Sequence, residues 1–306
     1  MNAGFRSAQR ALDQWVVTAR PLDGAGPILE AVATRADAPR LVASEVVEGG
    51  PGLARRPVPG APEVGFSAFL DGTQQSRLLA YIEGVPVVYG AVGAVIRVRR
   101  DRRMTTYSHG PLVERGVYGP AALLPAIDGM VDTGPVDVDD VHPAFLLERA
   151  VHVVQERRER LERLLAERWY ATESAPLWID GGLAAFAPSA VGVVKSHRTL
   201  YVDRGGLQVI CALAGGERTS VVRVVPKHRT PVLSWYLRMR EPEGRGPLWG
   251  LVRVEIADAV KDVTARADTI SRWVLAEVAP LALPDPRWDT LVYGVRDCEE
   301  YLRAVS

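Results

Sequence analysis

Apolar and polar positions alternate in a way that divides the chain into a run of strands, one long helix, further strands and two closing helices. The clearest helical spacing covers residues 143–168, where apolar side chains recur every three or four positions among arginines and glutamates. Pro143 stands where a first-turn proline is tolerated. Shorter β-rich runs are expected at 66–70, 77–81, 85–99, 105–113, 176–180, 191–194, 208–214, 220–225, 232–238 and 248–256, with helices near 257–278 and 289–304. This order predicts an α/β protein with a mixed central sheet flanked by helices.

The first sixty residues read as a separate N-terminal extension. Residues 7–19 and 27–37 show helix-like apolar spacing, which predicts a helical extension. Residues 48–65 are dense in glycine, proline and arginine and predict a loop. We therefore expect an extension at 1–60 and the main domain at 61–306.

Composition narrows the class of protein. Of the 306 residues, 47% are hydrophobic and 24% charged, which excludes a disordered chain. Cys211 and Cys298 are too few for a disulfide scaffold. No apolar run approaches the roughly 18 to 20 residues of a membrane span, and the N-terminus shows no secretory signal. A reduced, cytoplasmic protein without a membrane partner is expected.

The charge balance hides an unusual choice of basic residue. The 37 basic and 37 acidic side chains cancel, but only Lys195, Lys227 and Lys261 are lysines. A GC-rich coding sequence would explain the excess of arginine; so would phosphate binding, because the guanidinium fork matches phosphate oxygens. Arginines cluster at 97–103 and 149–168, so a neutral total could conceal a basic groove.

Two segments deliver an aspartate at the end of an apolar strand. They are Phe66-Ser-Ala-Phe-Leu-Asp71-Gly72 and Pro176-Leu-Trp-Ile-Asp180-Gly181. A carboxylate at a strand end is held rigidly, and the glycine after it lets a substrate approach. Asp-Gly is also a common turn dipeptide, so each segment alone has an ordinary structural explanation. If the strands were neighbours, the two carboxylates would repel unless a cation such as Mg²⁺ or Mn²⁺ lay between them.

A lysine follows the second aspartate. Residues 191–196 read Val-Gly-Val-Val-Lys-Ser, which places Lys195 at the end of a buried strand. A lysine there could neutralise a phosphate near the metal ions, or it could be an ordinary exposed strand-end residue.

Taken together, these motifs resemble the NurA nucleases. The resemblance rests on Leu70-Asp71-Gly72, a glutamate-bearing helix, and the stretch from Asp180 to Ser196, and it covers roughly residues 60–306. It implies an RNase H-like (PIWI-like) fold and manganese-dependent DNA cleavage. It also implies a homodimer that acts with a HerA-type hexameric ATPase in DNA end resection or phage defence.

The resemblance assigns metal ligands residue by residue. Asp71 and Asp180 match the two Asp-Gly aspartates, and the family's helix glutamate is best matched by Glu162, eighteen residues before Asp180. Glutamates 148, 156, 159 and 167 lie on the same predicted helix and stay open as alternatives.

The chain departs from the family near its C-terminus. The family ends with a tyrosine and then a histidine, whereas this chain has no histidine after His228. Tyr293 could match the tyrosine, and Asp297 is the candidate for the missing ligand, with Glu299 and Glu300 near enough to serve instead. An oxygen donor suits Mg²⁺ or Mn²⁺ at least as well as imidazole.

The expected activity is therefore that of a two-metal-ion deoxyribonuclease, acting as an exonuclease or a single-strand endonuclease. Two Mn²⁺ (or Mg²⁺) ions would be held by Asp71, Glu162, Asp180 and Asp297, with Lys195 as a further catalytic group. DNA would be bound by Lys195, Arg198, Tyr293, Arg99 and Arg100. The chain has no ATP-binding motif, so a translocase would supply the energy. The alternative is a non-catalytic RNase H-like adaptor that binds DNA or the translocase.

Overall fold

A computed structural model describes most of the chain. Its described residues are 7–8, 19–21, 38–101, 103–137, 141–183, 189–225, 230–242, 245–278 and 290–305. The helices predicted at 7–19 and 27–37 lie outside these ranges, apart from residues 7–8, which are helical, and residue 19, which is in a strand. The predicted helical extension is therefore not among the described elements.

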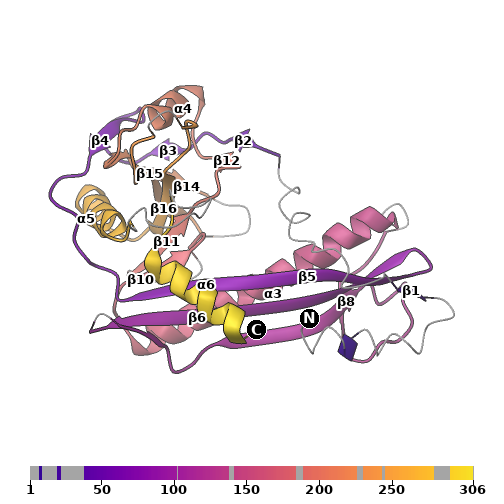
Figure 1. The fold of residues 1–306 in the computed structure, drawn as a ribbon. Coiled ribbons are helices and arrows are strands. Elements are labelled where there is room, and N and C mark those ends of the chain that lie inside the picture. Colours follow the sequence, from indigo (N-terminus) through magenta and orange to yellow (C-terminus); the bar gives the residue numbers. More distant parts are fainter. Residues whose placement is uncertain are drawn as a thin grey trace.

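Within the described residues, fourteen strands form one mixed sheet. This sheet is the core of the fold (Figure 1). Its main path runs β3-β14-β15-β16-β11-β10-β5-β6-β8-β9, and β2 pairs separately with β12. Most neighbours are antiparallel, but β10 is parallel to both β5 and β11. The strands are β1 (Ala19–Pro21), β2 (Arg40–Leu41), β3 (Glu45–Val46), β4 (Arg55–Pro57), β5 (Ala68–Ile82), β6 (Val85–Arg100), β7 (Arg103–Thr106), β8 (Leu112–Gly119), β9 (Met130–Asp132), β10 (Leu177–Asp180), β11 (Ala190–Val194), β12 (Thr199–Leu200), β13 (Glu217–Thr219), β14 (Val222–Val224), β15 (Val232–Arg238) and β16 (Leu251–Ala257).

Helices cover both faces of this sheet. Figure 1 shows α6 crossing in front of β5 and β6, with α3 behind them. One apolar core joins α3 to one face through residues such as Val154 and Leu70, and a second joins α5 and α6 to the other through Phe69 and Leu302. The helices labelled in Figure 1, all within the described residues, are α3 (Pro143–Thr172), α4 (Arg204–Cys211), α5 (Val263–Ala276) and α6 (Tyr293–Val305).

The predicted α/β class and mixed sheet are confirmed, while several elements differ. The two runs expected at 66–70 and 77–81 belong to the single strand β5, because the polar stretch between them stays paired with β6. Residues 208–214, predicted as a strand, lie largely in helix α4. Asp203 caps this helix by accepting a hydrogen bond from the Gly206 amide at 2.7 Å, which the short apolar run alone did not reveal.

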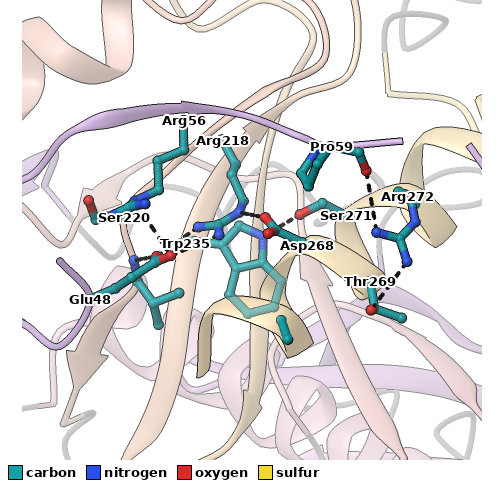
Figure 2. A network of polar contacts seen from close by, with 12 residues as sticks. Glu48, Arg56, Pro59, Arg218, Ser220, Trp235, Asp268, Thr269, Ser271 and Arg272 are labelled. Atoms are coloured by element: carbon teal, nitrogen blue, oxygen red, sulfur yellow. Dashed lines mark hydrogen bonds and ion pairs between the residues drawn. The ribbon is translucent and has the colours of Figure 1, made fainter. Parts of the chain in front are cut away.

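The segment before residue 60 contributes strands to the sheet. β3 pairs with β14 and β4 with β13. Between β3 and β4, the buried carboxylate of Glu48 accepts two hydrogen bonds from Arg218, whose guanidinium also donates to Asp268 of α5 at 2.7 Å (Figure 2). The division at residue 60 stays a prediction, but the strands on its N-terminal side are fixed to the C-terminal half.

In the part of the chain that the structure describes, no helix is both long and apolar enough to cross a membrane.

Candidate active site

The two Asp-Gly segments lie on neighbouring strands. β5 and β10 are parallel, with Leu70 opposite Ile179, so Asp71 and Asp180 come next, side by side. Asp180 ends β10 as expected, but Asp71 does not end its strand, because β5 continues to Ile82. Side chains alternate along a strand, and Phe69 and Trp178 pack into the core beneath α5 and α6. Asp71 and Asp180 therefore point to the face that α6 covers.

The carboxylate of Asp71 is buried among negative charges. The residue is 6% exposed, and its Oδ1 accepts a hydrogen bond from the Gly72 amide at 2.8 Å. Burial raises the pKa of Asp71 well above its usual range, and the charges of Asp180, Glu162 and Glu299 raise it further, while Lys195 opposes the shift. Asp71 thus lies in a cluster of acids that disfavours its own ionisation.

Glu162 reaches this cluster from α3, on the opposite side of β5. Its side chain lies against Gly72: a Cβ atom at that position would come within 2.2 Å of Glu162 Oε1. Arg158, one turn earlier, donates to the same oxygen at 3.0 Å. Only glycine at position 72 leaves room for this carboxylate beside Asp71.

Asp180 is paired with the lysine that the sequence singled out. β11 runs parallel to β10, with Val193 opposite Asp180, so Lys195 follows just beyond. Its Nζ lies 2.7 Å from Asp180 Oδ1.

Helix α6 contributes a fourth acid, Glu299. The helix packs closely on β5 at Gly294, where a Cβ would lie 2.4 Å from the Phe69 ring. Val295, Cys298 and Leu302 face the sheet, which leaves Glu299 at the flank of the helix beside Asp180.

Asp297 lies elsewhere on the same helix. Its Oδ2 accepts a hydrogen bond from Arg97 of β6 at 2.5 Å. Residues two apart on a helix point about 200° apart, so Asp297 and Glu299 take different directions. The buried residues of α6 show which side of the helix faces the sheet, and so separate Asp297 from Glu299. The sequence alone does not give the angle at which the helix packs on the sheet, so it could not predict which of the two acids reaches Asp71.

Two hollows meet at the acids. One, of about 670 Å³, is lined mainly by polar residues of β5 and by two arginines, Arg158 and Arg303. The other, of about 320 Å³, is lined by Lys195, His197 and leucines that include Leu291. Asp180 and Glu299 line both hollows.

The residues expected to bind DNA are dispersed. Arg99 forms a bidentate ion pair with Glu277 and lies over the Phe69 ring. Its guanidinium is therefore engaged in contacts within the protein. Arg100 and Arg198 are exposed. Tyr293, the first residue of α6, is 67% exposed.

The chemistry of the acids suits a hard cation. Four carboxylates, all oxygen donors, converge where like charges raise the pKa of Asp71, and a bound divalent ion would reverse that penalty. Among the described residues, however, no three acidic, histidine or cysteine side chains are close enough together to ligate one ion as they stand. Asp180, Glu162 and Glu299 each lie against a basic side chain instead.

No family model and no curated protein matches this chain. Among solved structures, it is similar to the crystal structure of the NurA nuclease from Sulfolobus solfataricus. The sequences are 14% identical, the TM-score is 0.44, and the alignment covers 80% of this chain and 84% of that one.

Proposed function

We propose that the protein is a metal-dependent DNA nuclease whose active site is the acid cluster where the first residues of β5 lie beside the end of β10. The observation that supports this most is Asp71: a buried carboxylate placed among three other acids, where its ionisation is disfavoured unless a cation binds. Repulsion among such carboxylates costs the fold stability, whereas a hard divalent cation needs oxygen donors of this kind.

In this proposal Asp71, Glu162, Asp180 and Glu299 hold two Mn²⁺ or Mg²⁺ ions. Glu299 takes the place that we had expected for Asp297, because Asp297 is bound to Arg97. When bound, the ions would lower the pKa of a water and stabilise the leaving oxygen of a phosphodiester.

The chain's own residues would prepare the site for the substrate. Gly72 keeps the Glu162 carboxylate beside Asp71. Lys195 balances the charge of Asp180 and lies where it could contact a phosphate. Exposed Tyr293 offers a ring on which a base could stack.

The RNase H-like assignment, the homodimer and a HerA-type partner belong to the same proposal. A translocase would feed a DNA strand to the acids, because the chain has no ATP-binding motif of its own. The sequence resemblance supports these points.

The test is cleavage of end-labelled linear single- and double-stranded DNA, with Mn²⁺ and with EDTA. We expect cleavage only with the metal, and a loss of at least about 100-fold in Asp71→Asn and Asp180→Asn, because amides keep the shape but not the charge that holds the ions. Full activity in either variant would refute the proposed site.

The competing function is a non-catalytic adaptor that binds DNA or a translocase. The ion pairs of Asp180, Glu162 and Glu299 favour it, since they neutralise acids without any metal. An adaptor would show no Mn²⁺ binding and no change in Tm on adding Mn²⁺.

A further inference from the structure

Three of the four clustered acids hold a basic side chain. Lys195 lies 2.7 Å from Asp180. Arg158 Nη1 lies 3.0 Å from Glu162, and Arg303 Nη2 lies 3.3 Å from Glu299. Both arginine pairs join residues four apart on a helix, so each guanidinium can leave its partner by side-chain rotation alone.

The two arginines come from opposite sides of the sheet and line the same hollow. Arg158 is on α3 and Arg303 is in the last turn of α6. Between them lies a polar stretch of β5, Thr73, Gln74 and Gln75, which begins two residues after Asp71 and also lines the hollow. Hydroxyl and amide groups flanked by guanidinium groups suit a phosphodiester backbone, which accepts hydrogen bonds and carries negative charge.

We propose that Arg158 and Arg303 bind successive phosphates of a single DNA strand in the larger hollow, and that a cation at the acids releases them to do so. This inference rests on the proposed function, because it takes DNA as the ligand of this site and the four acids as a cation site. With the carboxylates neutralised by a divalent ion, each arginine loses attraction to its glutamate and becomes available to a phosphate.

The arrangement makes metal and DNA cooperative ligands. Without a cation, a phosphate must compete with Glu162 and Glu299 for the two guanidinium groups, and it also meets the negative charge of the cluster. With a cation, both obstacles are removed. Linkage requires that DNA then raises the affinity for the cation by the same factor.

The size of the hollow favours one strand over a duplex. At about 670 Å³ it is of the size of a small-ligand site of about 300–1,000 Å³, which suits a short length of a single strand.

The test measures binding instead of cleavage. Fluorescence anisotropy follows a labelled oligodeoxythymidylate on the full chain, with Ca²⁺ in place of Mn²⁺ to hold off cleavage, and with EDTA. Ca²⁺ should tighten binding by the wild type at least about tenfold. Arg158→Gln and Arg303→Gln should each remove most of that gain and lower the slope of log affinity against log salt by about 0.7 per lost phosphate contact.

Arg160→Gln is the matched control. Arg160 is on the same helix as Arg158 and pairs with Glu114 at 2.6 Å, but it does not line the hollow. It should bind DNA like the wild type, and unchanged Tm values would show that all three variants fold.

The inference is overturned if Ca²⁺ leaves the wild-type affinity unchanged, or if Arg158→Gln and Arg303→Gln bind like Arg160→Gln. Its failure is distinguishable from that of the nuclease. Ca²⁺-dependent, arginine-dependent binding without Mn²⁺-dependent cleavage would retain the strand site and reject catalysis. Mn²⁺-dependent cleavage that is unchanged in Arg158→Gln and Arg303→Gln would retain catalysis and reject the strand site.

Discussion

Asp71 carries a charge that the folded protein disfavours. Its pKa is raised by burial and by the acids around it, so the folded state keeps the proton to a higher pH than the unfolded state does. Stability attributable to this residue is therefore greatest at acidic pH and falls as pH rises above the ordinary range of an aspartate. A group of carboxylates that binds a cation is expected to carry such a penalty when the cation is absent.

We therefore expect Asp71→Asn to unfold at higher denaturant concentration than the wild type in EDTA at pH 8. The difference should shrink as the pH is lowered toward 4, because Asp71 then regains its proton. Denaturant unfolding at both pH values measures it. A variant that is less stable than the wild type at pH 8 would show that Asp71 is satisfied without a cation.

The two acids of α6 should separate into different roles. Glu299→Gln should abolish Mn²⁺-dependent cleavage and leave the Tm nearly unchanged, because its side chain is at the acid cluster. Asp297→Asn should instead lower stability by about 1–3 kcal/mol, since it leaves half-buried Arg97 without its carboxylate. Calorimetric measurement of Mn²⁺ binding, together with the Tm, distinguishes the two variants. Loss of Mn²⁺ binding in Asp297→Asn but not in Glu299→Gln would favour Asp297 as the ligand.

At the scale of elements, the close contact between α3 and β5 sets the position of Glu162. The obstacle that a Cβ at Gly72 would meet is the end of this side chain, not the backbone, so the fold should tolerate alanine. Glu162 would have to move away from Asp71.

We expect Gly72→Ala to fold normally and to bind Mn²⁺ at least about tenfold more weakly. Gly116→Ala on β8 is the control, because its Cβ would make only ordinary contacts, the nearest at 3.6 Å. Circular dichroism tests whether both variants fold, and calorimetry measures their Mn²⁺ affinity. Equal Mn²⁺ affinity in the two would mean that the Glu162 position does not matter.

The sequence predicted those elements whose signals are local. The spacing of α3 and the two strand-Asp-Gly segments were visible in short windows, so the acids Asp71, Glu162 and Asp180, with Lys195, could be named before the structure was known. Glu299 could be named only as an alternative, because the docking of α6 decides which of its acids faces β5 and β10. The strand identity assigned to 208–214 was wrong because a short apolar run does not distinguish a strand from a helix.

At the scale of the whole molecule, buried charges fasten the N-terminal strands to the sheet. Glu48 and Arg218 have side chains that are 2% and 1% exposed, and Arg218 also holds Asp268 (Figure 2). Burial raises the pKa of Glu48, but the hydrogen bonds and charge of Arg218 and the Val221 amide outweigh it and leave the pKa lowered. Glu48 thus contributes stability above the ordinary pKa of a glutamate and loses it as pH falls through its lowered value.

Arg218→Met should cost about 3–5 kcal/mol of stability at pH 7, because it leaves Glu48 buried without its guanidinium. The gap to the wild type should narrow in acid, where Glu48 is protonated in both proteins. Arg223→Met is the control: Arg223 also joins two acids, Glu45 and Asp258, but its side chain is 37% exposed, so its loss should be far smaller. If denaturant unfolding shows the same loss of stability in Arg218→Met and Arg223→Met, burial does not make the Arg218 ion pairs more important than exposed ones.

Calorimetric titration of the metal-free protein with Mn²⁺ tests whether the acids beside the start of β5 and the end of β10 form a cation site. We expect two ions to bind to the wild type, with a rise in Tm, and this binding to be lost in Asp71→Asn and Glu299→Gln. Absence of Mn²⁺ binding to the wild type, or equal binding to both variants, would contradict it.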